Sequence, residues 1–451
     1  MLPMTVLRRF DCVLAPTKAQ VLGEYERLKG KLQGEALDAR LNKVAGQRFH
    51  NHSPLDFQKL KGDPNHVAQH LVSYIKGFSA NVRRIFEYFE FETEIEKMRE
   101  ANILYLVVSK FADVDLHPDR VPNEQMGLIF ENLIRRFNEL ANETAGDHFT
   151  PRDVIRLMVH ILFINDDALL ATPGTVRTLL DPACDTGGML AEAQNYLREH
   201  HPQARLFVYG QDYNKRAFAT AASDMLIKQV DHNGTGDNIR FGDTLTEDQF
   251  AGQTFDYFLT NPPFGVDWKK QQKEIEREHE KRGFAGRFGA GLPRVNDGAL
   301  LFLQHMIAKF EPVQPEKHKH GSRLAIVFSG SPLFTGGAGS GESNIRKWII
   351  ENDWRRRSSP CRNRCSTTLA SAPTFGSSPT ARKRGAGARS SSLTRATCGR
   401  RAARRTANAA WAISAGISPQ RRSRRSCACM GAARRTNARR SSITPISATP
   451  A

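Results

Sequence analysis

The side chains with the clearest chemical potential stand at the end of an apolar run. Residues 254–264 read T-F-D-Y-F-L-T-N-P-P-F, a pattern typical of a buried strand that ends in Asn261-Pro262-Pro263-Phe264. The Asn261 side-chain oxygen and the next backbone carbonyl can accept both hydrogens of an exocyclic amine on a nucleobase, which localises the amine lone pair for attack. The prolines stiffen the loop and remove backbone donors, and Phe264 offers a face for stacking a base swung out of a duplex. The alternative is a simple turn after a strand.

A second group of candidate residues lies upstream, where residues 176–190 contain an apolar run, Asp181, and a small-residue turn. A strand that feeds such a turn and a helix N-terminus is the usual cradle for a nucleoside cofactor, because free backbone N–H groups point at the ligand. No G-x-G-x-x-G occurs, which argues against a dinucleotide fold. Asp212 ends a further apolar run about two dozen residues after the glycines, where it can hold ribose hydroxyls.

Two more polar residues follow predicted strands, Asp243 after a short third strand and Asn261 after a fourth. Carboxyl ends of parallel strands meet at one edge of a sheet. The four strand ends therefore predict one crevice at the carboxyl edge of a doubly wound, mostly parallel α/β sheet.

With these motifs the chain resembles the modification (M) subunit of type I restriction-modification systems, an N6-adenine DNA methyltransferase. The resemblance covers about residues 1–354 and implies a class I S-adenosylmethionine-dependent methyltransferase fold at 146–354, after a helical domain at 1–145. The motifs that carry it are D-H-F-T-P-R (147–152), D-P-A-C-D-T-G-G (181–188), G-Q-D (210–212), F-D-Y-F-L-T-N-P-P-F-G-V-D-W (255–268), G-F-A-G-R-F-G-A-G-L-P-R (283–294) and the segment 325–343.

The resemblance also implies S-adenosylmethionine as cofactor and a direct methyl transfer to adenine N6, with no covalent enzyme intermediate. Cys184 is then a small buried residue under the glycine turn. Thr150 has an alternative role as the N-cap of a helix that begins with Pro151. The implied base-receiving residues are Asn261, Pro262, Pro263 and Phe264, and the implied cofactor residues are Asp147, His148, Phe149, Thr150, Pro151, Arg152, Asp181, Thr186, Gly187, Gly188, Asp212 and Asp243.

One position departs from the family turn, which normally reads G-T-G-G and here begins with Asp185. If the backbone needs positive φ at this position, a side chain costs about 1 kcal/mol. A carboxylate there would also face the cofactor's carboxylate. We therefore predict weakened cofactor binding, which calorimetry on Asp185→Gly would test.

The charge of the chain is divided very unevenly. Residues 355–451 contain 21 Arg, one Lys and no acid, which is a charge of +22, so residues 1–354 carry −4 of the total +18. The segment 355–451 has six Leu and Ile together and no Val, too little apolar material to offset chain entropy. We expect it to be disordered.

The composition of 355–451, mostly Arg, Ala, Ser and Thr, is typical of GC-rich DNA translated out of frame. Codons for Ser359–Leu369 can be chosen so that a shifted frame reads A-L-P-E-Q-L-F-Y-N-T, a segment of the kind the family carries after E-N-D-W. We therefore predict a frameshift near codon 354. The strand at Leu324–Phe328 and the helix at Ser343–Asn352 would then lose neighbours, leaving an exposed sheet edge. The alternative is a genuine basic arm that binds nucleic acid.

The remaining features bound the function. The first residues resemble the middle of a helix, so the start looks clipped. No membrane span, signal or metal-ligand spacing is evident, and few cysteines outside the tail favour a reducing cytoplasm. The run Lys269–Arg282 predicts a solvated helix before a glycine-rich loop (283–293), which is either a mobile cover near DNA or plainly flexible.

The implied partners are double-stranded DNA, a specificity subunit, a restriction nuclease subunit and a second M subunit. Two alternatives stay open, an inactive remnant and a nucleic-acid-binding protein that acts through the tail.

Overall fold

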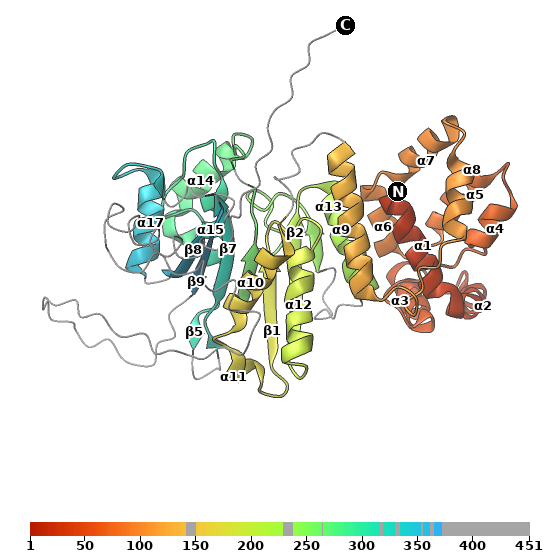
Figure 1. Cartoon of the computed structure of the whole chain (residues 1–451), viewed down its shortest axis with the longest axis horizontal. Helices are drawn as coiled ribbons and strands as arrows, with labels where there is room; N and C mark the ends of the chain where they lie inside the picture. Colours follow the sequence, from red (N-terminus) through yellow and green to blue (C-terminus); the bar gives the residue numbers. More distant parts are fainter. Residues whose placement is uncertain are drawn as a thin grey trace, which may run out of the picture. The chain divides into compact units, whose positions relative to one another are not determined.

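The computed structural model describes residues 1–140, 150–228, 238–263, 265–314, 319–329, 334–352, 355–360 and 365–371. The first part of the chain is helical, as its apolar spacing and its prolines predict (Figure 1). Its elements are α1 (Leu2–Leu14), η1 (Ala15–Thr17), α2 (Lys18–Leu28), α3 (Gly34–Ala45), α4 (Phe57–Gly62), α5 (Val67–Lys76), α6 (Ala80–Tyr88), α7 (Phe91–Glu100), α8 (Leu104–Ala112) and α9 (Asn123–Leu140).

An α/β sheet follows, in the order β3-β2-β1-β4-β7-β9-β8. Strands β3, β2, β1, β4 and β7 run parallel, which agrees with the predicted doubly wound sheet. Helices connect β1 to β2, β2 to β3 and β4 to β7, because a parallel pair requires a crossover. The strands are β1 (Val176–Asp181), β2 (Arg205–Asp212), β3 (Ile239–Phe241), β4 (Tyr257–Thr260), β7 (Arg323–Ser329), β8 (Arg355–Pro360) and β9 (Cys365–Ser371), with a separate two-stranded ribbon of β5 (Val313–Gln314) and β6 (Lys319–His320).

The helices around the sheet differ in how deeply they are buried. All of α15 is buried under the sheet, whereas α14 buries only Ile275 and so forms the predicted solvated helix. The remaining helices of this part are α10 (Arg152–Phe163), α11 (Asp167–Leu170), α12 (Gly188–His200), α13 (Lys215–Ile227), α14 (Gln272–Arg282), η2 (Gly283–Ala285), α15 (Ala299–Ile307) and α17 (Gly341–Glu351).

The helical region and one face of the sheet share a continuous apolar core. The Tyr88 ring, at the end of α6, lies 4.7 Å from the rings of Phe218 on α13 and Phe241 on β3. Beside this contact the Lys215 ammonium lies 2.8 Å from the Glu90 carboxylate. The helical region therefore packs on α13, the helix that follows Asp212 in the chain.

The structure corrects two expectations about the segment after residue 354. Strand β9 pairs with β7 over its whole length, from Arg323 opposite Ser371 to Ser329 opposite Cys365, and β8 pairs with β9. The predicted loss of neighbours beside Leu324–Phe328 is therefore wrong, and disorder is wrong for 355–360 and 365–371. The two threonines in C-S-T-T-L-A-S suit a strand, although the low hydrophobicity of the segment hid that signal.

None of the helices within the described ranges is long and apolar enough to cross a membrane.

The structure predicts that a buried arginine in α1 stabilises the helical region. The Arg9 guanidinium is fully buried and donates to the carbonyls of Leu116 and Val121 and to the Asn123 side chain. Arg9→Met should lower the free energy of unfolding by about 2 kcal/mol, because these acceptors would lose their donor. Urea unfolding followed by circular dichroism measures this change.

The matched control is Arg27→Met, which removes an exposed guanidinium that pairs with Glu24 on the same surface. It should leave the unfolding midpoint nearly unchanged, because solvent screens exposed ion pairs. Equal effects of the two substitutions would contradict the role given to Arg9.

Candidate functional site

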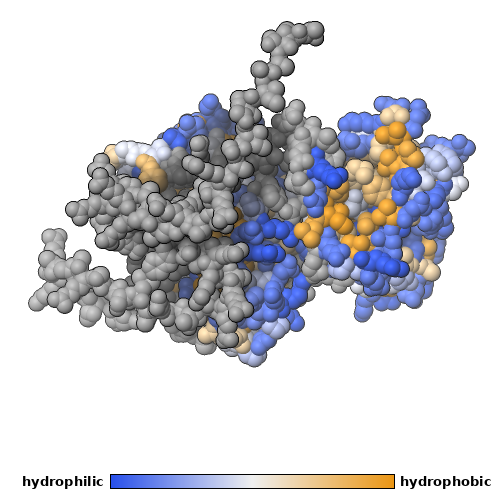
Figure 2. Space-filling view, in the orientation of Figure 1, coloured by the Kyte–Doolittle hydropathy of each residue, from blue (hydrophilic) through white to orange (hydrophobic). Residues whose placement is uncertain are grey.

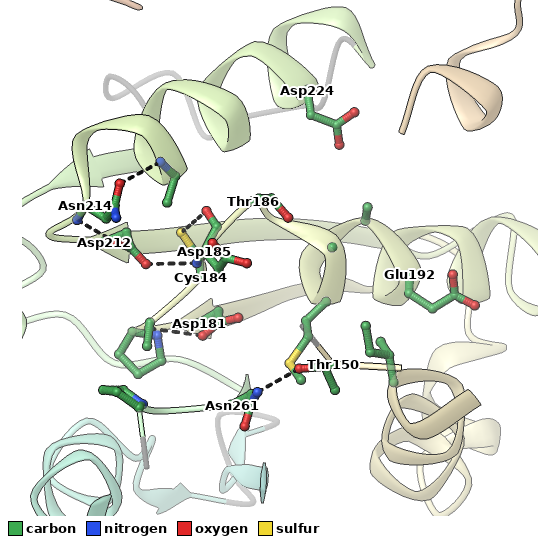
Figure 3. Close-up of a pocket in the computed structure, with 18 of the residues that line it drawn as sticks. Thr150, Asp181, Cys184, Asp185, Thr186, Glu192, Asp212, Asn214, Asp224 and Asn261 are labelled. Carbon is green, nitrogen blue, oxygen red and sulfur yellow. Dashed lines mark hydrogen bonds between the residues drawn. The ribbon is translucent and has the colours of Figure 1, made fainter. Parts of the chain in front are cut away.

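The carboxyl ends of β1, β2, β3 and β4 open into one cavity of about 1290 Å³ (Figure 3). The predicted convergence of these strand ends is therefore confirmed, while the chemical roles of the residues stay predictions. Nine of the predicted site residues line the cavity: Thr150, Arg152, Asp181, Thr186, Gly188, Asp212, Asp243, Asn261 and Pro263.

The other predicted residues divide into two groups. Pro151, Gly187 and Pro262 are not among the residues that line the cavity. Gly187 instead adopts a left-handed φ of 80° at the start of α12, and an added Cβ would lie 3.4 Å from the Ala221 methyl group. Glycine at this position allows the left-handed conformation and the close packing against α13. Asp147, His148, Phe149 and Phe264 lie outside the described residues.

A hydrogen bond between two distant motifs orients the Asn261 amide. Its Nδ2 donates to Thr150 Oγ1 at 2.8 Å, so the F-T-P-R box and the N-P-P-F motif meet (Figure 3). The Asn261 Oδ1 is buried and has no hydrogen-bond partner among the described residues. The N-cap alternative for Thr150 is wrong, since Pro151 holds the N-cap position and Thr150 binds Asn261 instead.

Asp181 ties the two central strands together at the cavity wall. Its carboxyl is almost fully buried and accepts hydrogen bonds from Thr260 Oγ1 at 2.6 Å and from the Ala183 N–H at 3.1 Å. Burial raises the pKa of the Asp181 carboxyl to about 7, although these two hydrogen bonds oppose the shift. Asp181 therefore serves mainly to hold the turn after β1 in place, because its carboxyl already accepts two hydrogen bonds from the protein.

Asp185 has a positive φ of 45°, so the condition on which the predicted strain depends is met. Its N–H donates to Asp212 Oδ2 at 2.9 Å, while Asp212 Oδ1 accepts from the Asn214 N–H at 2.8 Å. Although water reaches Asp185 through the open cavity, the protein surrounding it raises the pKa of its carboxyl to about 7, and the Asp212 carboxylate adds to this shift. Three carboxyl groups thus crowd one end of the cavity.

Cys184 packs as predicted, buried against Gly210 on β2. A Cβ at Gly210 would lie 2.8 Å from the Cys184 sulfur, so this strand position has room only for glycine. Burial raises the pKa of the Cys184 thiol well above its ordinary value, which keeps the sulfur protonated and unreactive.

Several residues escaped the sequence analysis. Asn214 caps α13 by accepting from the N–H groups of Arg216 and Ala217, and the position of an Asn before a helix could have revealed it. Gln271 donates to Asp243 Oδ2 at 2.6 Å. No local pattern marks Gln271, because its partner lies 28 residues away in the chain.

These features, a helical region followed by a parallel α/β sheet whose carboxyl edge opens into a cavity with polar strand-end residues, define a methyltransferase-like protein. Residues 122–355 match the N-6 DNA methylase family, and residues 1–111 match the HsdM N-terminal domain. The chain belongs to the N-6 DNA methylase family.

Known proteins agree with this assignment. The chain is 27% identical over 249 residues to the type I restriction enzyme MjaIX methylase subunit of Methanocaldococcus jannaschii, covering 55% of this chain and 39% of that protein. It is 24% identical to the HindI methylase subunit of Haemophilus influenzae, covering 51% of this chain and 45% of that protein. The chain thus spans less than half the length of these relatives.

The fold also matches that of a solved methyltransferase subunit of a type I restriction-modification system from Streptococcus thermophilus. The TM-score is 0.56 at 20% identity, and the match covers 82% of this chain and 78% of that one.

We predict that Asp185→Gly stabilises the protein and that the gain grows with pH. Glycine removes about 1 kcal/mol of backbone strain at φ 45°. The pKa of Asp185 in the folded chain, about 7, lies above its ordinary value of 3.8, so the wild type loses stability as pH rises between these values. Thermal unfolding at pH 5 and pH 8 measures the effect.

The Asp185→Ala variant separates the two causes, because it removes the carboxyl but keeps the strained Cβ. It should reproduce only the part of the gain that depends on pH. A gain from Asp185→Gly that is equal at both pH values would show that the carboxyl is not perturbed.

Proposed function

We propose that this chain transfers a methyl group from S-adenosylmethionine to N6 of adenine in DNA, as the M subunit of a type I restriction-modification complex. The observation that carries this proposal is the Asn261 amide, whose Oδ1 is buried with no hydrogen-bond partner in the described part of the chain, while its Nδ2 is held by Thr150. A buried acceptor without a donor is costly. An incoming amine would supply the missing donor.

The orientation of this amide suits an amine rather than a carbonyl substrate. Thr150 occupies the donor side of Asn261, so the acceptor side remains for the substrate. Pro262 has no N–H, so the backbone here offers acceptors without a competing donor. An adenine amine that donates to Asn261 and to the Pro262 carbonyl would keep its lone pair out of the ring.

The residues at the other strand ends fit the cofactor. Asp212 keeps acceptor capacity for ribose hydroxyls, since a carboxylate offers about four lone-pair sites. Helix α12 begins at Gly188 without a side-chain cap, which leaves N–H groups for a carboxylate. Asp243 lines the same cavity from the end of β3. S-adenosylmethionine would supply a methyl group activated by its sulfonium.

The transfer needs no nucleophile from the protein. The activated methyl group would pass from the cofactor's sulfur directly to the adenine nitrogen, which would release its proton to solvent, so the chain's own residues would only bind and orient the two reactants. The role of Asn261 is to orient the amine and to favour its attacking form. The protonated, buried Cys184 takes no part.

The proposed partners follow from the family and from the surface. A specificity subunit would select the DNA site, and a nuclease subunit and a second M subunit would complete the complex. The helical region has exposed apolar side chains, among them Met1, Leu106 and Leu128, and Figure 2 shows apolar area over this region, whereas the surface over α12 is hydrophilic. An exposed apolar area of this kind fits contact with another subunit.

The proposal predicts that the chain, mixed with its specificity subunit, incorporates labelled methyl groups into duplex DNA. Asn261→Ala should lower the transfer rate by roughly 100-fold or more, because an acceptor in the transition state is lost. It should leave cofactor affinity by calorimetry nearly unchanged. The control is Asn195→Ala, another asparagine that lines the cavity, on α12. Cofactor binding and transfer both absent from the wild type would favour the inactive remnant.

We predict that Thr150→Val also slows transfer, by roughly 10- to 100-fold, because the Asn261 amide would lose the partner that fixes its orientation. Thr150→Ser keeps the hydroxyl and should retain most of the rate. Single-turnover kinetics distinguish the two variants, and equal rates would contradict the role of this hydrogen bond.

A further inference from the structure

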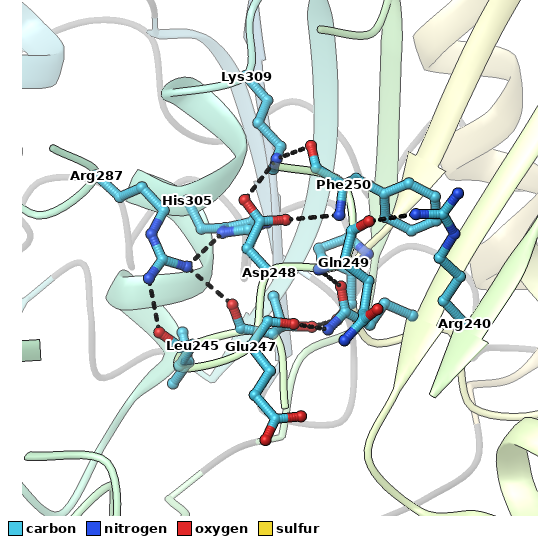
Figure 4. Close-up of polar contacts among 12 residues, drawn as sticks. Arg240, Leu245, Glu247, Asp248, Gln249, Phe250, Arg287, His305 and Lys309 are labelled. Atoms are coloured by element: carbon cyan, nitrogen blue, oxygen red, sulfur yellow. Dashed lines mark hydrogen bonds and ion pairs between the residues drawn. The ribbon is translucent and has the colours of Figure 1, made fainter. Parts of the chain in front are cut away.

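A guanidinium joins the glycine-rich loop to the turn that carries Asp243. Arg287 belongs to the loop 283–291, and its side chain extends toward the connection between β3 and β4 (Figure 4). Its Nη1 donates to the Thr244 carbonyl at 2.9 Å and its Nη2 to the Leu245 carbonyl at 2.8 Å. These two residues directly follow Asp243 at the cavity wall.

Other contacts hold the same guanidinium from the opposite side. The Glu278 carboxylate of α14 accepts from Arg287 Nη2 at 2.7 Å and from the Arg287 N–H at 2.7 Å. The Nη1 also lies 3.2 Å from His305 Nδ1. Burial lowers the pKa of His305 well below its ordinary value, so the ring is neutral and can accept this hydrogen bond. Arg287 is thus fixed by side chains of α14 and α15.

The glycines of the loop serve close packing. A Cβ at Gly289 would lie 2.5 Å from the Gly283 backbone, and one at Gly291 would lie 3.0 Å from the Gly341 carbonyl. The loop therefore folds back on itself and against α17. Its Phe284 is 70% exposed, so the loop presents an aromatic ring outward while Arg287 reaches inward.

The turn after β3 also forms hydrogen bonds, independent of Arg287, with residues next to the predicted cofactor site. Thr244 Oγ1 donates to the Pro182 carbonyl at 2.5 Å, within the glycine turn after β1. Gln211, the neighbour of Asp212, donates to the Gly242 carbonyl at 3.2 Å and to the Glu247 carbonyl at 2.8 Å. A shift of Thr244 would therefore reach both of the turns predicted to hold the cofactor.

From these contacts we infer that Arg287 is a positioning residue. By holding the carbonyls of Thr244 and Leu245, it links the position of the glycine-rich loop to the affinity for the cofactor. The inference rests on the proposed function, because Asp243 and the glycine turn are taken as the cofactor site. Coupling of two sites is reciprocal. Cofactor binding should therefore also steady the loop.

The test compares cofactor affinity by calorimetry for the full chain, Arg287→Lys and Arg287→Ala. A lysine keeps the charge but lacks the rigid planar guanidinium that spans the carbonyls of Thr244 and Leu245. Both variants should bind S-adenosylmethionine roughly 2- to 30-fold more weakly. Arg346→Lys is the matched control, since Arg346 also donates to two backbone carbonyls, those of Thr335 and Gly336, away from the cavity.

Hydrogen exchange on the wild-type chain gives a second measurement that does not depend on how the variants fold. Saturating cofactor should slow exchange at residues 243–245 and also at 283–291. Protection confined to the cavity, or an Arg287→Lys variant that binds as tightly as wild type, would overturn this inference alone. A wild-type chain that binds no cofactor would instead contradict the proposed function, and the inference with it.

Discussion

The buried carboxyl of Asp181 is the constraint on which the site depends. It accepts from Ala183 at the start of the glycine turn and from Thr260 at the end of β4. The residue after Thr260 is Asn261, so one side chain links the glycine turn after β1 to the proposed amine acceptor. Because β1 and β4 are neighbours in a parallel sheet, the turns that follow them lie side by side at the carboxyl edge.

The Asp181 carboxyl also belongs to a group of three carboxyl groups that repel one another when ionised. Asp181, Asp185 and Asp212 lie together at one end of the cavity. Burial raises the pKa of Asp181 to about 7, and the surrounding protein with the Asp212 carboxylate raises the pKa of the more exposed Asp185 to about 7. A turn that normally has glycine at position 185 avoids both the strain and the third carboxyl. Among the described site residues, Asp185 is therefore the one that combines backbone strain with a crowded carboxyl, and its predicted effect is on cofactor binding.

The helical region shares its apolar core with the sheet. Its core continues into the face of the sheet covered by α12 and α13, and Tyr88 packs on the helix that begins just after Asp212. On the other face, Arg287 and Lys309 hold the connection between β3 and β4, with Lys309 donating to the Phe250 carbonyl at 2.6 Å. The cavity is thus bordered by elements that are each fixed from outside the sheet.

The sequence by itself determined the parallel sheet, the helical region before it and the strand-end residues Asp181, Asp212, Asp243 and Asn261. Strand periodicity and turn chemistry are local, and parallel strands must bring their carboxyl ends together. Only the tertiary structure decided the partners of those residues, such as Thr150 for Asn261, Gln271 for Asp243 and Arg287 for the turn after β3. It also paired β9 with β7, which composition had argued against. These contacts join residues far apart in the chain, and the pattern around either partner carries no trace of the other.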